Sequence, residues 1–351
     1  GGKVIVMLNN ANAMEIDEIK NNDGVDAIME IGFPGGYGFY GVADILSGEA
    51  NPSGHLTDTY AVTNANSPAA QNFGNYEWTN ADPSVNINAE EVEAEDIYTG
   101  YKYYETRYAD TVLGQGNADA TVGSSTGKAW NYDDEVSYPF GYGLSYTTFA
   151  YSNLKLSMEN PTEKDTVMVS ADVTNTGKSA GKEVVQLYIR DLTGSAIRPE
   201  KELKGCEKVF LEPGETKTVT MELNKRSFAW YNTELHDWFA ASGDYEILVG
   251  ASSRDIRLTE TLHLNSSQRL PMHVHMNTTL GDLLRNPETA EAAKKLIQKY
   301  LSGEAGSEAA SEAVSEEMTM AMTDSMPLRA LMGFAGVSRK ELDSVIEKLN
   351  K

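Results

Sequence analysis

The chain has 351 residues, enough for two or three domains, and 40% of them are hydrophobic, a proportion typical of globular proteins. Its formal net charge of -23 repels phosphate backbones, which excludes nucleic acid as a partner and makes an anionic membrane an equally poor one. Cys206 is the only cysteine, so no disulfide forms within the chain.

The segment 1–60 alternates apolar runs with helical and glycine-rich stretches. The runs Val4–Leu8 and Val25–Ile31 predict strands, and apolar spacing in Ala13–Lys20 predicts a helix between them. A glycine loop over 33–41 and a short helix from Val42 to Ser47 follow. Strands that alternate with helices indicate a parallel α/β sheet, which needs cover on both faces. Because two strands cannot form such a domain, we expect the chain to begin inside a larger one.

The start of the sequence does not indicate the cellular compartment of the protein. Gly1 is not an initiator methionine, no signal peptide is visible, and an apolar run follows almost at once. We therefore expect the true N-terminus to lie upstream, and the compartment stays open between bacterial cytoplasm and secretion. No apolar stretch approaches the roughly 18 residues of a membrane span, so we predict no membrane partner.

The glycine loop contains a motif that suggests a nucleotide site. Gly36-Tyr-Gly38-Phe-Tyr-Gly41 has the spacing of a dinucleotide-binding loop, and Asp58 lies near the distance of a ribose-binding acid. However, the next helix has room only for Val42–Ser47, and Pro34 interrupts the strand that should precede the loop. A dehydrogenase is therefore the least favoured of the three hypotheses that we consider, and we predict no cofactor.

Residues 98–108 form a dense aromatic segment between 64–95 and 109–130, two stretches that we interpret as long surface insertions. Sugars stack on aromatic rings and hydrogen-bond to carboxylates and arginine, so this composition suits a saccharide. An equally physical alternative puts the tyrosines on a strand packed between two domains, with Arg107 paired to Glu105 or to a neighbour. The candidate substrate-binding residues here are Glu95, Asp96, Tyr98, Tyr104, Glu105 and Arg107.

From about 150 to 266 the hydrophobic period changes to two. Val167–Val173 alternates apolar and polar residues, and Glu183–Ile189, Lys217–Leu223 and Tyr245–Val249 repeat the pattern between turn signals such as Asn175-Thr-Gly177. About seven short strands at this spacing are typical of an immunoglobulin-like β-sandwich. The cysteine pair of true immunoglobulin domains is absent, which favours the fibronectin type III variety.

The rest of the chain is predicted to be helical. Asn286-Pro287 resembles an N-cap followed by proline at the first helical position, and it predicts a helix through Tyr300. Ser338 and Glu341 form a capping box before a second helix. The stretch 302–317, with Ser-Glu-Ala repeats, is interpreted as a flexible linker. The predicted domains are an α/β domain over 1–148, a fibronectin-like sandwich over 149–266 and a helical extension over 267–351.

Other familiar sites are not indicated. His273-Val-His275 has no carboxylate or thiol cluster beside it, so we predict no metal site. Cys206 lies in a strand pattern, and we expect it to be a buried structural thiol. No Gly-x-Ser-x-Gly motif occurs, which counts against a serine hydrolase.

Several motifs, in one order along residues 1–260, resemble glycoside hydrolase family 3 of the β-glucosidase type. Tyr138–Phe149 looks like the family's most recognisable signature, and Val173–Gly177 resembles part of the fibronectin-like domain that many members carry. The other matching motifs are Phe33–Gly38, Gly41–Gly48, Asn51–Leu56, Glu95–Tyr104, Gly181–Tyr188, Glu202–Gly205 and Leu211–Glu215. The resemblance implies the C-terminal portion of such an enzyme.

The resemblance also implies a mechanism. Family members are retaining, which requires a carboxylate nucleophile and a carboxylic acid about 5–5.5 Å apart. In the family the nucleophile belongs to a barrel-like domain that usually precedes the sandwich, and the acid/base precedes the strand with which this chain starts. We therefore assign no catalytic residue here and expect the chain alone to be inactive.

What the chain supplies, by this resemblance, is a wall of the site for a β-linked saccharide that the missing N-terminal domain completes. The 33–41 loop adds Tyr37 to the candidates of the 95–107 segment. The sequence departs from the family at Asp96, where glycine is usual, and at His55 and Lys102, where arginine is common. The alternative hypothesis is a non-catalytic carbohydrate-binding or structural module. The oligomeric state stays open.

Overall fold

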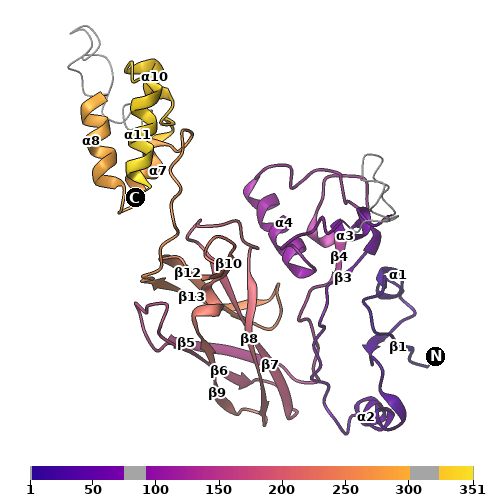
Figure 1. Ribbon diagram of the computed structural model, residues 1–351. Helices are drawn as coiled ribbons and strands as arrows, with labels where there is room; N and C mark the ends of the chain where they lie inside the picture. The colour runs from indigo at the N-terminus through magenta and orange to yellow at the C-terminus, as the bar shows by residue number, and fades with distance from the viewer. Residues whose placement is uncertain (1, 75–91, 301–323, 351) are drawn as a thin grey trace. The chain divides into compact units, whose positions relative to one another are not determined.

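A computed structural model of the chain describes residues 2–74, 92–300 and 324–350 (Figure 1). The chain forms two compact units, Gly1–Arg269 and Leu270–Lys351. The first unit contains an α/β part and a β-sandwich, and the second is helical.

The α/β part begins with two parallel strands, as predicted. β1 (Ile5–Leu8) pairs with β2 (Ala27–Glu30) in the register Ile5 to Ala27. The helix predicted over 13–20 is only one turn long, α1 (Asp17–Lys20). Leu8 and Ile16 are buried between these elements, and Tyr60 joins them from the following segment.

The predicted glycine loop over 33–41 is wrong, because α2 runs from Gly35 to Ser47 and includes residues 35–41. Glycine costs about 1 kcal/mol relative to alanine inside a helix, which is why the composition indicated a loop. The first turn nevertheless closes, since the Gly38 amide donates to the Pro34 carbonyl at 2.9 Å. A β-carbon at Gly38 would lie 2.8 Å from that of Pro34, so this position needs glycine even within the helix.

The strand considered for the aromatic segment in the alternative is also wrong, because α4 (Tyr101–Leu113) is a helix. Tyrosine favours strands, but contacts at Tyr101, Tyr104 and Tyr108 recur every three or four residues, which is the helical period. The insertion predicted over 109–130 is thus helical through Leu113 and then becomes a series of turns.

Short elements hold α4 in place. β3 (Tyr60–Ala61) pairs antiparallel with β4 (Val136–Tyr138), which brings two segments far apart in the sequence side by side. Trp130, Tyr132 and Val136 pack with Ala61 and Tyr104 in a small core. The remaining elements of this part are η1 (Asn64–Asn66), α3 (Pro68–Gln71) and α5 (Tyr132–Glu135).

The predicted β-sandwich is confirmed as a three-stranded sheet, β5-β6-β9, and a four-stranded sheet, β13-β12-β7-β8. Residues that alternate along the strands, such as Val167, Val169 and Val173, are fully buried between the sheets. The strands are β5 (Phe149–Leu156), β6 (Val167–Asn175), β7 (Gly181–Asp191), β8 (Glu202–Leu211), β9 (Thr216–Leu223), β12 (Gly243–Gly250) and β13 (Ile256–Leu264). Between β9 and β12 the chain forms α6 (Lys225–Phe228) and the hairpin β10 (Trp230–Asn232) and β11 (Asp237–Phe239).

The expectation that Cys206 is a buried structural thiol is wrong, because its side chain is exposed. It lies on β8, an edge strand of the four-stranded sheet, on the face that does not meet the other sheet. Among the described residues there is no helix with the length and apolar character needed to cross a bilayer. Nor do their histidine, cysteine and carboxylate side chains gather into a group that could hold a metal ion.

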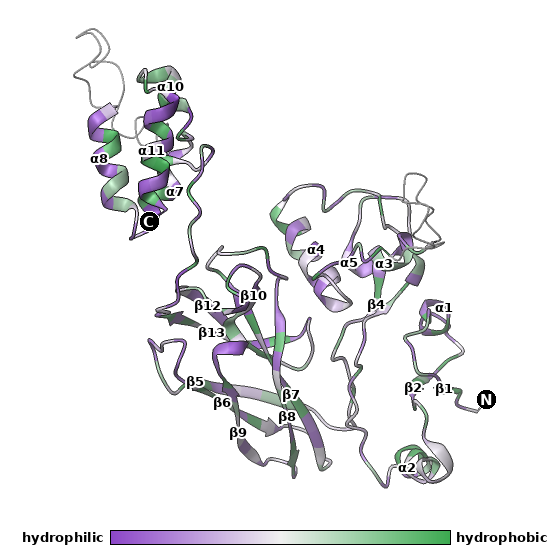
Figure 2. Cartoon of the chain, viewed as in Figure 1, coloured by the Kyte–Doolittle hydropathy of each residue, from purple (hydrophilic) through white to green (hydrophobic). Residues whose placement is uncertain are grey.

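The second unit contains α7 (Leu280–Arg285), α8 (Ala290–Tyr300), α10 (Ala330–Phe334) and α11 (Arg339–Leu349). The helix predicted through Tyr300 is α8, but it begins at Ala290 rather than at Pro287. Asn286 accepts from the Glu288 amide through its side chain, as predicted for an N-cap, and it is also the C-cap of α7, which a Thr279–Asp282 capping box begins. Ser338 is the N-cap of α11, as predicted, and accepts from the Glu341 amide. Figure 2 shows hydrophobic and hydrophilic residues alternating along α8 and α11, and Leu283, Leu296, Leu331 and Leu342 form their shared core. The predicted linker over 302–317 lies outside the described residues.

Candidate functional site

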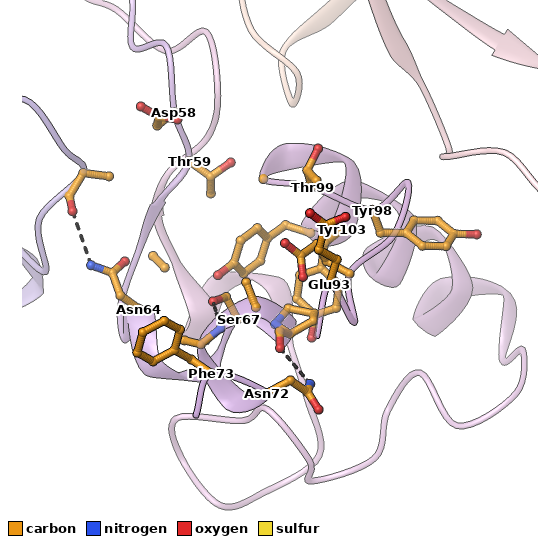
Figure 3. A pocket seen from close by; sticks show the side chains of 18 of the residues that line it. Asp58, Thr59, Asn64, Ser67, Asn72, Phe73, Glu93, Tyr98, Thr99 and Tyr103 are labelled. Atoms are coloured by element: carbon orange, nitrogen blue, oxygen red, sulfur yellow. Dashed lines mark hydrogen bonds between the residues drawn. The ribbon is translucent and has the colours of Figure 1, made fainter. Parts of the chain in front are cut away.

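A cavity of about 910 Å³ lies in the α/β part (Figure 3). One wall comes from the segment between Asp58 and Gly74, and the other from the segment between Val92 and Tyr104. The residues that join these walls, 75–91, lie outside the described part of the chain. Figure 3 shows Phe73 on one side of the cavity and Glu93 and Tyr103 on the other, with the Tyr98 ring pointing away from them.

Hydrogen bonds fix the first wall. The Asn64 amide donates to a Glu15 carboxylate oxygen at 2.6 Å, and its side chain donates to the Ala13 carbonyl at 3.3 Å. Ser67 caps α3 by accepting from the Ala70 amide at 3.2 Å, and Pro68 occupies the first helical position, where its missing N–H costs nothing.

Two residues with positive φ shape the second wall. Gly100, immediately before α4, has φ 55° and ψ -128°, a conformation that only glycine adopts readily. Asp96 has φ 48°, in the left-handed region, where an aspartate is tolerated and a glycine is easier. This conformation gives a physical reason for the glycine that the family usually has there.

The cavity combines carboxylates with phenol rings. Asp58, Glu93 and Glu95 line it together with Tyr98 and Tyr104. Burial raises the pKa of Tyr104, with smaller contributions from Tyr103 and Glu135. Burial also raises the pKa of Tyr98, as do the nearby Asp110 and Asp96 carboxylates. Both phenols therefore stay protonated at neutral pH and can donate hydrogen bonds.

Two lining groups have unused hydrogen-bonding capacity. The Oε2 atom of Glu95 and the Oγ1 atom of Thr59 are buried and have no hydrogen-bond partner among the residues described. Leaving a buried polar atom unpaired costs about 1–3 kcal/mol, so hydroxyl groups of a ligand would be bound favourably here. An acceptor carboxylate beside aromatic rings is the chemistry expected of a sugar site.

The structure thus brings together three of the seven predicted candidates, Glu95, Tyr98 and Tyr104, at one cavity. Tyr37 does not line it and lies on α2 with 87% of its surface exposed. Asp96 is in the same segment but is also not a lining residue.

Glu105 points elsewhere and is 1% exposed. Its carboxylate accepts from the Tyr132 hydroxyl at 2.9 Å and from the Ser253 hydroxyl at 3.0 Å. Lys201 Nζ lies 3.2 Å from it and Arg254 Nη1 lies 3.3 Å from it. Three of these four partners belong to the β-sandwich, so Glu105 joins α4 to that domain.

Arg107 does not pair with Glu105; its partner one helical turn away is the Tyr103 hydroxyl, to which it donates at 2.6 Å. Its guanidinium donates to the carbonyls of Ala118, Ala120 and Val122 at 2.8–2.9 Å. It also lies 4.7 Å from the centre of the Trp130 ring, within range of a cation–π interaction. Arg107 therefore holds the turns after α4 in place.

Sequence reasoning missed several lining residues, most of them on the first wall. Their alternation with alanine and asparagine is typical of an ordinary surface loop, and nothing in the sequence connects 58–73 with 92–104. Tyr103 could have been predicted as a lining residue, because it lies in the aromatic segment itself. The missed residues include Asp58, Thr59, Asn64, Phe73, Glu93 and Tyr103.

Comparison with known proteins now decides the family. Residues 1–146 match the glycosyl hydrolase family 3 C-terminal domain, and residues 183–253 match the fibronectin type III-like domain. The chain belongs to glycoside hydrolase family 3. The predicted fold class, a family 3 α/β domain followed by a fibronectin-like sandwich, is confirmed.

Named relatives are glycosidases. The chain is 34% identical over 350 residues to thermostable beta-glucosidase B of Acetivibrio thermocellus, covering 99% of this chain and 40% of that protein. It is 30% identical over 339 residues to an exo-alpha-(1->6)-L-arabinopyranosidase of Bifidobacterium breve, covering 97% of this chain and 39% of the relative. The chain therefore spans about 40% of the length of these two relatives.

A solved structure supports the same assignment. The family 3 beta-glucosidase of Bifidobacterium adolescentis superposes with a TM-score of 0.63 at 29% identity, over 84% of this chain and 37% of that one.

Proposed function

We propose that this family 3 chain is the C-terminal portion of a retaining, exo-acting β-glycosidase that hydrolyses O-glycosyl bonds of a β-linked glucoside. The observation that carries the proposal is the cavity between 58–74 and 92–104, which joins carboxylates to phenol rings on a family 3 C-terminal domain. The name of the Acetivibrio thermocellus relative supports glucose as the sugar. The Bifidobacterium breve relative makes an arabinopyranoside the first competing substrate to test.

The proposed role of the cavity is to hold sugar rather than to cleave it. Glu95 would accept hydrogen bonds from sugar hydroxyls through its unpaired buried oxygen, and the Tyr104 phenol would donate them. The resemblance assigns the nucleophile and the acid/base to other parts of a complete family 3 enzyme, so neither is proposed among residues 1–351. Retention would follow from two displacements through a covalent glycosyl-enzyme at those groups.

The test begins with the open reading frame that encodes this chain. We expect a barrel-like domain with a nucleophilic aspartate upstream, and we expect the full product to hydrolyse p-nitrophenyl β-glucoside with retention, as followed by NMR of the released anomer. The purified 351-residue chain should give no turnover in the same assay. An arabinopyranoside arm measures the sugar preference.

Two results would overturn the proposal. Retaining turnover by the 351-residue chain alone would mean that the chemistry lies within it. A reading frame without a barrel-like domain would instead favour the alternative, a non-catalytic carbohydrate-binding module.

A further inference from the structure

Helix α4 (Tyr101–Leu113) contacts the cavity with one face and the β-sandwich with another. Tyr103 and Tyr104 line the cavity, together with Gly100 immediately before the helix. Tyr101 and Glu105, one helical turn apart, contact the β-sandwich instead. Because the helix is a rigid body of little more than three turns, a contact on one face fixes the position of the other.

The sandwich-facing side of α4 is held by more than one bond. The Leu203 amide donates to the Tyr101 hydroxyl at 2.8 Å, and the Glu200 amide donates to Thr106 Oγ1 at 2.8 Å. The Tyr101 ring stacks on Phe140 with 4.4 Å between ring centres. These contacts dock α4 onto β8 (Glu202–Leu211) and the residues just before it.

Glu105 is the charged centre of this contact. Its carboxylate is buried with Lys201, and the Lys201 ammonium also donates to the Ser253 carbonyl at 2.8 Å. Arg254 stacks on the Tyr108 ring at 3.4 Å, so it is oriented toward Glu105 by the helix itself. Breaking one member of a buried ion pair leaves the other charge uncompensated, so the cluster tolerates only one arrangement.

We propose that the β-sandwich positions the saccharide-binding wall of the cavity through Glu105, which makes Glu105 a positioning residue for a β-linked glucoside. This inference rests on the proposed function, since it takes the cavity to be the sugar site. It gives the fibronectin-like domain a part in substrate affinity, although none of its residues lines the cavity. In the purely structural alternative, the contacts of Glu105 only stabilise the fold, so that their loss lowers the stability of the protein and leaves the cavity unchanged.

The experiment compares Glu105→Gln with a matched control in the full-length enzyme. Gln keeps the size of the side chain but removes the charge that faces Lys201 and Arg254. We expect KM for p-nitrophenyl β-glucoside to rise about tenfold, equivalent to about 1.4 kcal/mol, while kcat changes little. Amide hydrogen exchange at residues 98–104 should accelerate in the same variant, as measured by mass spectrometry.

Glu163→Gln is the control. Glu163 is also buried and accepts from the Ser267 amide and hydroxyl at 2.8 and 2.5 Å, a partner that does not belong to α4. It should lower the melting temperature without changing KM or exchange at 98–104. If Glu105→Gln fails to fold, Ser253→Ala removes only one of its hydrogen bonds, from the sandwich side, and should give a smaller change of the same kind.

The outcomes separate the two proposals. An active enzyme in which Glu105→Gln and Ser253→Ala melt lower, with unchanged KM and unchanged exchange at 98–104, overturns the positioning role and leaves the proposed function intact. A full-length product without β-glycosidase activity overturns the proposed function and this inference with it. A KM increase accompanied by faster exchange at 98–104, absent in Glu163→Gln, supports both.

Discussion

The β-sandwich and the N-terminal segment 1–60 differ in how far they bury their hydrophobic side chains. Between its two sheets the sandwich buries a continuous core, in which Val185, Leu187 and Ile247 have no exposed surface. In the segment 1–60, Phe33, Tyr37 and Tyr40 are each more than 70% exposed. Large apolar side chains in solvent, where they gather into a patch, mark surfaces that another body covers or that promote association. One chain thus combines a domain that closes its own core with a part that leaves large apolar side chains exposed.

The largest expected effect tests this difference directly. Leu187→Ala should lower the free energy of unfolding by about 2–5 kcal/mol, because it opens a cavity in a closed core. Ile5→Ala should cost less than about 1 kcal/mol, because Ile5 is 43% exposed on β1. Guanidinium unfolding followed by circular dichroism measures both. Equal losses would mean that the segment 1–60 is packed as tightly as the sandwich.

A smaller effect on stability is expected from substitutions of two glycines in the α/β part. Gly100→Ala should destabilise the α/β part by about 1–3 kcal/mol, because alanine is strained at φ 55°. The matched control is Gly36→Ala in α2, where an added β-carbon meets no other atom within 4 Å. That substitution should raise stability by about 0.4–1 kcal/mol. Destabilisation by Gly36→Ala would contradict the helix found where the sequence indicated a loop.

The smallest effect concerns the junction between the two regions, where His55 Nε2 lies 3.7 Å from a Glu183 oxygen. Burial raises the pKa of Glu183, partly offset by the hydrogen bond from Tyr151 and the charge of Arg257. The folded chain therefore binds this proton more tightly than the unfolded chain does. Its stability should fall as the pH rises from the unfolded pKa of the carboxyl through the raised folded pKa.

Glu183→Gln removes this charge while keeping an acceptor for Tyr151. The variant should be more stable than the parent at pH 8, with a difference that shrinks toward pH 4. Thermal melts across this range provide the measurement. A pH-independent difference would mean that the Glu183 charge is not disfavoured by burial.

The sequence predicted the sandwich because its signal is local. Val167–Val173 alternates with period two, and each apolar position is buried as that period requires. The same reasoning failed for α4, where strand-favouring tyrosines follow a helical period that becomes visible only with their contacts. It failed for α2 because glycine propensity is a weak prior that the surrounding structure overrides.

The candidate site was predictable only on one side. Glu95, Tyr98 and Tyr104 were found because aromatic and acidic residues cluster in sequence. Their opposite wall is contributed by a separate, earlier segment of the chain, and no periodicity links the two. Arg107 and Glu105 were linked by proximity in sequence, but they bind different partners on different sides of α4. The domain boundaries at 148/149 and 266/267 stay predictions.

The exposed thiol of Cys206 has a practical consequence. Because it is the only cysteine of the chain and lies on the outer edge of β8, a maleimide dye or spin label attaches at one defined point without any engineering. Its strand carries the residues that α4 docks against, so the label lies a few residues from that contact. Such a probe gives a spectroscopic reading of the sandwich in the native sequence, and a second label in Leu270–Lys351 turns it into a ruler between the two units.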